Sequence, residues 1–325
     1  MGAGQLQVDV GDLVFDVRTD GPEDGRPVLL LHGFPQTSLS WSAVTPLLAE
    51  AGLRTYAPDQ LGYSPGARPG ETDAYALPAL AAVSADLMTA LDIPTADVVG
   101  HDWGANVAWA LAGWHADRVR TLTAVSVPHP TAYTLAYRAD PEQKERSAYI
   151  KLFWQAGKAE RVLLEDDARR LRRVLGDVPA EAVDTYVAHL SAPGALTAAL
   201  DWYRAMSSST PLDPVRVPTT YVWSDEDMAV GRTAAEACAD QVTGDYRFVE
   251  LTGISHWVPE KAPKRWPRRS WTGSPAAEPT AGPAAVLVRR RWLMRRRSPG
   301  PAARPRRAGR PAAGSPRPAR GGTRR

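Results

Sequence analysis

The chain has 325 residues, 44% of them hydrophobic, and a net charge of +3. This length suits one α/β domain with an insertion, or two domains. Its single cysteine, Cys238, excludes an internal disulfide and a cysteine-rich metal site. No apolar run approaches the ~18 residues of a membrane span, and the polar, acidic start of the chain does not resemble a signal peptide. We therefore expect a cytoplasmic protein with no membrane partner.

The net charge hides two segments of opposite composition. Residues 264–325 hold 18 of the 39 Lys and Arg residues and a single acid, Glu278, which gives a charge of +17. Residues 1–263 hold the other 21 bases and 35 acids, which gives −14. The acidic body has the composition of a globular chain, whereas the Arg-, Pro-, Ala- and Gly-rich tail has little from which to build a core. We expect the tail to be disordered.

In the first part of the body, short apolar runs alternate with helical patterns. Residues 6–17 predict a β-hairpin that is split by Gly11 and Asp12. The order of strand and helix that follows predicts parallel strands with helices on both faces of the sheet, and a site at the carboxyl ends of the strands. The predicted strands are residues 28–31, 55–58, 97–99 and 119–127, and the predicted helices are residues 41–51, 78–91 and 105–114.

From about residue 128 to residue 209 the pattern is helical, with segments at residues 149–154, 160–175, 180–189 and 195–206, and no strand is evident. Residues 219–223 and 247–251 then resume strand character, with a helix at residues 234–241 between them. The sequence thus predicts a core in two parts, residues 1–127 and 213–263. A helical lid at residues 128–212 separates the parts, and the tail covers residues 264–325.

The segment Gly100–Gly104 (Gly-His-Asp-Trp-Gly) follows an apolar run and opens an Ala-rich helix. Its pattern of small residues around a central side chain is typical of a strand-turn-helix elbow, in which that side chain is the nucleophile. The centre is usually serine, but here it is Asp102. A carboxylate that attacks an ester carbonyl gives an anhydride, whereas attack on a saturated carbon gives a stable ester. Asp102 therefore indicates an epoxide or a carbon–halogen bond as the electrophile, although an isolated aspartate there could simply cap the helix.

Two further candidates follow the later strands. Asp225 and Asp227 come after the strand at residues 219–223, and His256 lies in the loop after the last strand of the body. Nucleophile, acid and histidine in this chain order are typical of hydrolases whose histidine comes last. Either aspartate could orient His256, and we favour Asp227.

Together these motifs resemble the epoxide hydrolase branch of the α/β-hydrolase superfamily. The resemblance runs from about residue 6 to residue 263. It includes Gly100–Gly104, the oxyanion-loop motif His32–Pro35 (His-Gly-Phe-Pro), the acid turn Trp223–Asp227 and the histidine loop Gly253–Trp257. Ser224 in the acid turn departs from the family pattern, which has glycine there.

The resemblance also implies roles for residues of the lid and the oxyanion loop. Tyr149 and Tyr203 stand where family members place the two tyrosines that hold the epoxide oxygen. Ring opening creates an alkoxide, a poor leaving group that needs a proton from a donor with a pKa of ~10. A single lid tyrosine would more often serve packing, but two in the expected contexts favour this role. The backbone N–H groups of Phe34 and Trp103 would form the oxyanion hole, and Phe34, Trp103 and Trp202 would contact the substrate.

The implied reaction has two steps and calls for no metal or cofactor. Asp102 opens the epoxide of a small apolar substrate and becomes an alkyl ester, while Tyr149 and Tyr203 donate to the ring oxygen. Water activated by His256, which Asp227 orients, then hydrolyses the ester to a vicinal diol.

The nearest alternative is a haloalkane dehalogenase-like hydrolase with the same nucleophile. A departing halide needs N–H donors, which Trp103 could supply, whereas the tyrosine pair favours an epoxide. Enzymes that act on haloacids carry arginine beside the nucleophile, so Trp103 argues against that class, and Asp102 itself disfavours an esterase.

The tail leaves two further interpretations open. A segment with a charge of +17 would bind nucleic acid or other polyanions without sequence preference, through counterion release. Its composition is also that of GC-rich DNA read out of frame, and we favour this frameshift origin. The family's amphipathic helix after the histidine loop is missing beyond Pro263, so the hydrolase body could be weakened or inactive.

Overall fold

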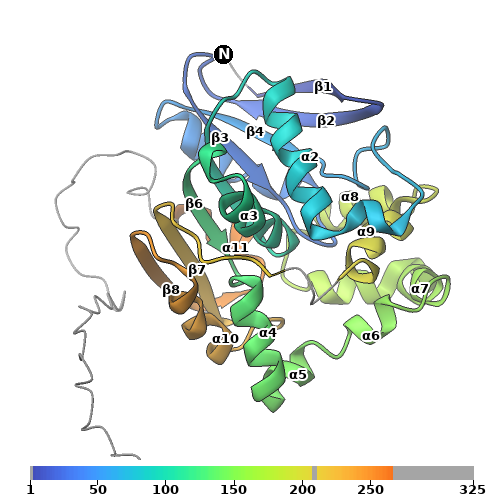
Figure 1. Cartoon of the computed structure of the whole chain (residues 1–325). Coiled ribbons are helices and arrows are strands. Elements are labelled where there is room, and N and C mark those ends of the chain that lie inside the picture. The colour runs from blue at the N-terminus through green and yellow to red at the C-terminus, as the bar shows by residue number, and fades with distance from the viewer. Residues whose placement is uncertain (1–2, 207–210, 266–325) are drawn as a thin grey trace, which may run out of the picture. The chain divides into compact units, whose positions relative to one another are not determined.

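The computed structural model describes residues 3–206 and 211–265. Their centre is one eight-stranded sheet (Figure 1). The first two strands form an antiparallel hairpin whose second strand pairs antiparallel with β4, and every other pairing is parallel. The strand order across the sheet is β1 (Gly4–Val10), β2 (Leu13–Asp20), β4 (Leu53–Pro58), β3 (Arg26–Leu31), β5 (Ala96–His101), β6 (Val119–Val125), β7 (Thr219–Glu226) and β8 (Tyr246–Ser255).

The sheet order reverses at the neighbouring strands β3 and β5. From β3 the chain proceeds to β4 on one side, and from β5 it proceeds to β6, β7 and β8 on the other. A reversal of this kind leaves a crevice at the carboxyl ends of the strands, where open α/β sheets bind their ligands. The loops after β3 and β5 both begin there.

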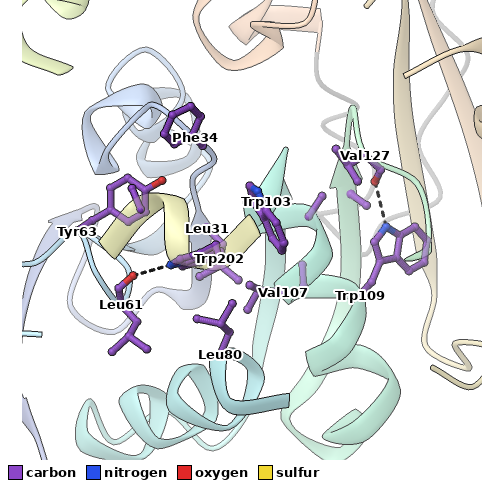
Figure 2. Packing of buried hydrophobic residues seen from close by; sticks show 14 of the residues in the cluster. Leu31, Phe34, Leu61, Tyr63, Leu80, Trp103, Val107, Trp109, Val127 and Trp202 are labelled. Atoms are coloured by element: carbon purple, nitrogen blue, oxygen red, sulfur yellow. Dashed lines mark hydrogen bonds between the residues drawn. The ribbon is translucent and has the colours of Figure 1, made fainter. Parts of the chain in front are cut away.

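The apolar strands are buried on both faces of the sheet. In β3, Leu29 and Leu31 join the cluster that includes Trp109 and Trp202, whereas Val28 and Leu30 join a second cluster on the opposite face. Figure 2 shows part of the first cluster, which packs beneath the start of α3. The helices of the core are α1 (Thr45–Ala49), α2 (Leu77–Ala90), α3 (Trp103–Trp114), α10 (Arg232–Ala237) and α11 (Val258–Lys261).

Six helices and no strand connect β6 to residue 206, on the lid side of the sheet (Figure 1). The first two of them were not predicted from the sequence. Each begins at a proline whose preceding residue caps the helix, as Asp140 does by accepting a hydrogen bond of 2.9 Å from the backbone N–H of Glu142. The lid helices are α4 (Pro130–Ala139), α5 (Pro141–Arg146), α6 (Ile150–Phe153), α7 (Lys158–Leu175), α8 (Ala180–Leu190) and α9 (Ala195–Arg204).

The predicted fold class, a mostly parallel sheet flanked by helices with a helical lid, is confirmed. The helix predicted at residues 41–51 is shorter, because a 3₁₀ helix at Ser38–Trp41 precedes α1, whose second residue is a proline. The predicted tail lies outside the described residues from residue 266 onward. Among the residues described, no helix combines the length and the hydrophobicity that crossing a bilayer requires.

Candidate active site

Asp102 occupies the tight turn between β5 and α3. Its backbone has φ of 52° and ψ of −120°, a strained conformation for a residue with a side chain. A Cβ on Gly100 would lie 2.1 Å from the carbonyl oxygen of Gly104, and a Cβ on Gly104 would lie 2.0 Å from the carbonyl oxygen of Leu31. Both flanking positions therefore require glycine, which explains the small residues of the elbow.

One oxygen of the Asp102 carboxylate is held by a backbone donor, since the N–H of Phe34 donates to Oδ1 over 2.8 Å. A Cβ on Gly33 would lie 2.4 Å from Oδ1, so glycine lets the loop approach this closely. Of the two N–H groups predicted for the oxyanion hole, that of Phe34 therefore bonds to Asp102, and that of Trp103 helps to lower the pKa of the carboxyl. Oδ2 lies 3.4 Å from Nε2 of His256.

Asp227, and not Asp225, lies against His256. Both oxygens of Asp227 are 3.0 Å from Nδ1 of His256, and Oδ1 also accepts from the backbone N–H groups of Ala229 and Val230. Asp225 instead accepts a hydrogen bond of 2.8 Å from the backbone N–H of Gly253 in an exposed turn. Of the two acids that the sequence left open, only Asp227 can orient the imidazole in this geometry.

Ser126 completes this cluster and was missed by the sequence analysis. It directly follows β6 with a positive φ of 69°, and its hydroxyl lies 2.8 Å from Nδ1 of His256 and within a short hydrogen bond of Asp227 Oδ2. Its only sequence signal was its place at the end of a strand.

The three ionisable groups of the cluster stabilise one another's charges. Burial alone would raise the pKa of Asp102 and of Asp227, but hydrogen bonds to His256 and its charge lower both pKa values below the ordinary range. Burial would lower the pKa of His256, yet the charge of Asp227 and the hydrogen bonds to both carboxylates raise it to about 10. At neutral pH the cluster therefore holds two carboxylates around an imidazolium.

Two lid tyrosines lie near enough to Asp102 for its charge to act on the pKa of their hydroxyls, although the side chain of Tyr149 is 39% exposed. Tyr203, on α9, is 4% exposed, and its ring lies 5.1 Å from Trp103 and 5.5 Å from Phe34 between centroids. The ring of Tyr149, just before α6, lies 6.3 Å from that of Tyr203. Burial and the charge of Asp102 raise the pKa of both hydroxyls well above their usual range, so they stay protonated at neutral pH. Phenols that remain neutral can donate hydrogen bonds or protons.

Three other aromatic residues of the lid have hydrogen-bond partners of their own. Trp202 is buried beneath Trp103, and its indole donates to the carbonyl oxygen of Leu61 over 2.9 Å (Figure 2). Trp202 therefore borders the site through its contact with Trp103. Trp154 is 53% exposed and donates to the backbone carbonyl of Tyr203 from outside. Tyr133, which the sequence analysis did not single out, bonds to Ser147 over 2.6 Å, and its pKa is affected by Asp102.

The lid also holds the turn that carries Asp227. The buried Gln143 on α5 donates to the carbonyl of Ala229 and accepts from the N–H of Gly231, each over 2.9 Å. Arg146 on the same helix donates to the carbonyl oxygen of Asp227. Because these contacts join residues that are more than 80 positions apart, local sequence patterns do not reveal them.

Comparisons with known proteins agree with this geometry. A family model described as the alpha/beta hydrolase fold matches residues 26–263. The AB hydrolase superfamily protein YfhM of Bacillus subtilis is 34% identical over an alignment of 265 residues, which covers 79% of this chain and 92% of the relative. Epoxide hydrolase A of Mycobacterium tuberculosis is 32% identical over 286 residues, covering 74% of this chain and 88% of the relative.

A solved structure agrees with these comparisons. The crystal structure of epoxide hydrolase A from Mycobacterium thermoresistibile matches with a TM-score of 0.72 and 28% sequence identity, over 81% of this chain and 95% of that chain. Together with the family model and the sequence relatives, this match places the chain in a known family. The chain belongs to the α/β-hydrolase family, in the branch that contains these epoxide hydrolases.

Proposed function

We propose that the protein is an epoxide hydrolase, which converts a small apolar epoxide to a vicinal diol through an alkyl ester on Asp102. One observation carries this proposal. A single carboxylate has one oxygen held by the N–H of Phe34 and the other 3.4 Å from Nε2 of His256, and its charge acts on two protonated tyrosines of the lid. The relatives named epoxide hydrolases support the same function.

In the first step, Oδ2 of Asp102 attacks the less hindered carbon of the epoxide. The carbon–oxygen bond of the ring breaks, its electron pair goes to the ring oxygen, and Tyr149 and Tyr203 donate to that oxygen as its charge develops. Oδ1 becomes the carbonyl oxygen of the new ester. It already lies 2.8 Å from the Phe34 nitrogen, so the oxyanion donors are in place before the second step.

Formation of the ester prepares His256 to act as a base. The charge of Asp102 and its hydrogen bond are two of the causes that raise the pKa of His256 to about 10. Esterification removes both, so the pKa of His256 falls, and the proton it releases balances the proton that a tyrosine gave to the ring oxygen. Neutral His256 then takes a proton from water, whose oxygen attacks the ester carbonyl.

The alkyl ester can be observed directly by intact-mass measurement. We expect the His256→Gln variant, incubated with a panel of epoxides, to gain the full mass of the epoxide, because the ester forms but is not hydrolysed. The Asp102→Asn variant should gain nothing, which makes it the matched control. Absence of an adduct with every epoxide that the wild-type protein converts would overturn the two-step reaction.

Product analysis separates the dehalogenase alternative. The protonated tyrosines Tyr149 and Tyr203 suit an oxygen that takes up a proton, whereas a departing halide needs none. We therefore expect diol formation from epoxides and no halide release from haloalkanes of similar size. Halide release without diol formation would reverse this assignment.

A further inference from the structure

Behind His256 lies a chain of buried polar side chains that the proposed reaction does not use. His101, the last residue of β5, has Nε2 2.9 Å from the backbone carbonyl oxygen of His256 and Nδ1 3.0 Å from Oε1 of Gln36. The amide nitrogen Nε2 of Gln36 is 2.5 Å from Oε1 of Glu260 on α11. Gln36 and His101 have no exposed surface. The chain thus connects a carboxyl group to the backbone of the predicted base.

The donors and acceptors along this chain determine which atoms carry a hydrogen. The carbonyl of His256 can only accept, so Nε2 of His101 must carry hydrogen. Burial, and then the charge of His256, lower the pKa of His101 to about 4, so the ring is neutral and Nδ1 must accept. In the structure the Gln36 amide presents Oε1 to Nδ1 and Nε2 to Glu260, but an amide oxygen cannot donate to Nδ1. The amide must therefore be turned over, with its NH₂ group toward His101 and its oxygen toward Glu260. Two oxygens at the 2.5 Å that separates these positions need a hydrogen between them, and Glu260 must supply it.

The surroundings of Glu260 favour this protonated form. Tyr186 on α8 donates to Oε1 over 3.1 Å, while Oε2 is buried and has no hydrogen-bond partner in the part of the chain that the structure describes. A buried carboxylate oxygen without a partner is costly, and a neutral carboxyl is less so. Burial accordingly raises the pKa of Glu260 to about 7. The titratable groups that face Glu260 are Tyr186 and His256, and His101 is connected to it through Gln36. Arg18 and Asp59 act on the pKa of Tyr186. Lys261, on the same helix as Glu260, pairs with Asp177.

We propose that Glu260 holds a proton in the resting protein and, through Gln36 and His101, fixes the backbone of His256 for hydrolysis of the ester. This proposal rests on the proposed function and makes Glu260 a positioning residue for its second step. When Glu260 ionises, the amide of Gln36 must turn back to donate to the carboxylate. Neutral His101 then has to donate from Nδ1, and its bare Nε2 faces the carbonyl of His256 without a hydrogen bond.

The rate of ester hydrolysis should therefore fall as the pH rises through the pKa of Glu260. Loss of one positioning hydrogen bond predicts a decrease of about five- to tenfold in wild-type protein. In Glu260→Gln the new NH₂ group donates to Gln36 at every pH, so the rate should match the wild type at pH 5.5 and lack this decrease. Gln36→Leu, which interrupts the chain, should be slow at all pH values. Glu181→Gln, an exposed glutamate on α8, should keep the wild-type profile.

Single-turnover measurements of ester formation and ester hydrolysis, from pH 5.5 to 9, provide the test. A parallel loss of both rates in Glu260→Gln at all pH values would indicate a merely structural role and overturn the proposal. A wild-type decrease that persists unchanged in Glu260→Gln would overturn it as well.

Infrared difference spectra between wild type and Glu260→Gln test the proton without any substrate. The carbonyl stretch of a protonated carboxyl should be present in wild type at pH 5.5 and absent at pH 9. Its absence at pH 5.5 contradicts the proposal. Its presence in a protein that converts no epoxide would mean that the proposed function fails while the protonated chain stands.

Discussion

The sheet edge and the lid contribute to the same site in different ways. At the sheet edge, Asp102 is positioned by the backbone, with glycines at 33, 100 and 104 allowing contacts that no Cβ would permit. In the lid, contacts between side chains position the helices. Arg204 pairs with Glu160 over 2.8 Å and with Asp201 over 3.0 Å, and it donates to the carbonyl of Phe153, which ties α9 to α6 and α7.

The two regions also differ in charge. The sheet edge holds ionised groups whose pKa values favour charge, whereas the lid holds phenols whose pKa values are raised so that they stay neutral. A nucleophile and its base need fixed positions and charge, and a proton donor needs to keep its proton until the ring opens. Because of this difference in charge, we expect substitutions at the sheet edge to abolish the reaction and substitutions in the lid to slow it.

Asp102→Asn should have the largest effect. An amide is a poor nucleophile, so we expect diol formation to fall by roughly 10⁴-fold or more. Folding should survive, because the amide can still accept from the N–H of Phe34. Initial rates of diol formation and thermal unfolding check both expectations. A variant that keeps more than a hundredth of the activity would contradict a covalent role for Asp102.

The lid tyrosines should show a smaller and shared effect. Tyr149→Phe and Tyr203→Phe should each slow ester formation by about 10²-fold, because one proton donor is left, and the double variant should lose far more. Ester hydrolysis should change little, since His256 drives it. Stopped-flow measurement of both steps is the check. Equal slowing of the two steps would show that the tyrosines support the site generally rather than the epoxide oxygen.

Gln143→Leu tests whether the lid also acts on the sheet edge. It removes both hydrogen bonds to the turn of Asp227, so we expect ester hydrolysis to slow by about tenfold and the free energy of unfolding to fall by about 1–3 kcal/mol. Gln155→Leu, an exposed lid glutamine, is the matched control and should change neither. If ester formation slowed instead, the lid would be acting on substrate entry.

Sequence patterns predicted those parts of the molecule that short segments determine. The strands of the core were visible as apolar runs, and Asp102 and His256 stood out because glycine-containing motifs surround them. The sequence favoured Asp227 but left Asp225 open, since both follow the same strand and only the path of the turn brings one of them to His256. Ser126 reaches Asp227 across 101 positions, a contact that depends on the packed sheet and leaves no local pattern.

The pH dependence of stability separates the two regions once more, without any effect on a catalytic step. Because the pKa of His256 is raised from 6.5 to about 10, its stabilising contribution is complete below pH 6.5 and is lost progressively as the pH rises toward 10. One proton accounts for a slope of at most about 1.4 kcal/mol per pH unit. Chemical denaturation of wild type and His256→Gln between pH 7.5 and 8.5, above the pKa of Glu260 and below the ordinary pKa of the Cys238 thiol, should show this slope in wild type alone. Tyr203→Phe should retain it, since the lid tyrosines carry no charge in this range. A slope that persists in His256→Gln would place the titrating proton elsewhere and remove the imidazolium from the resting site.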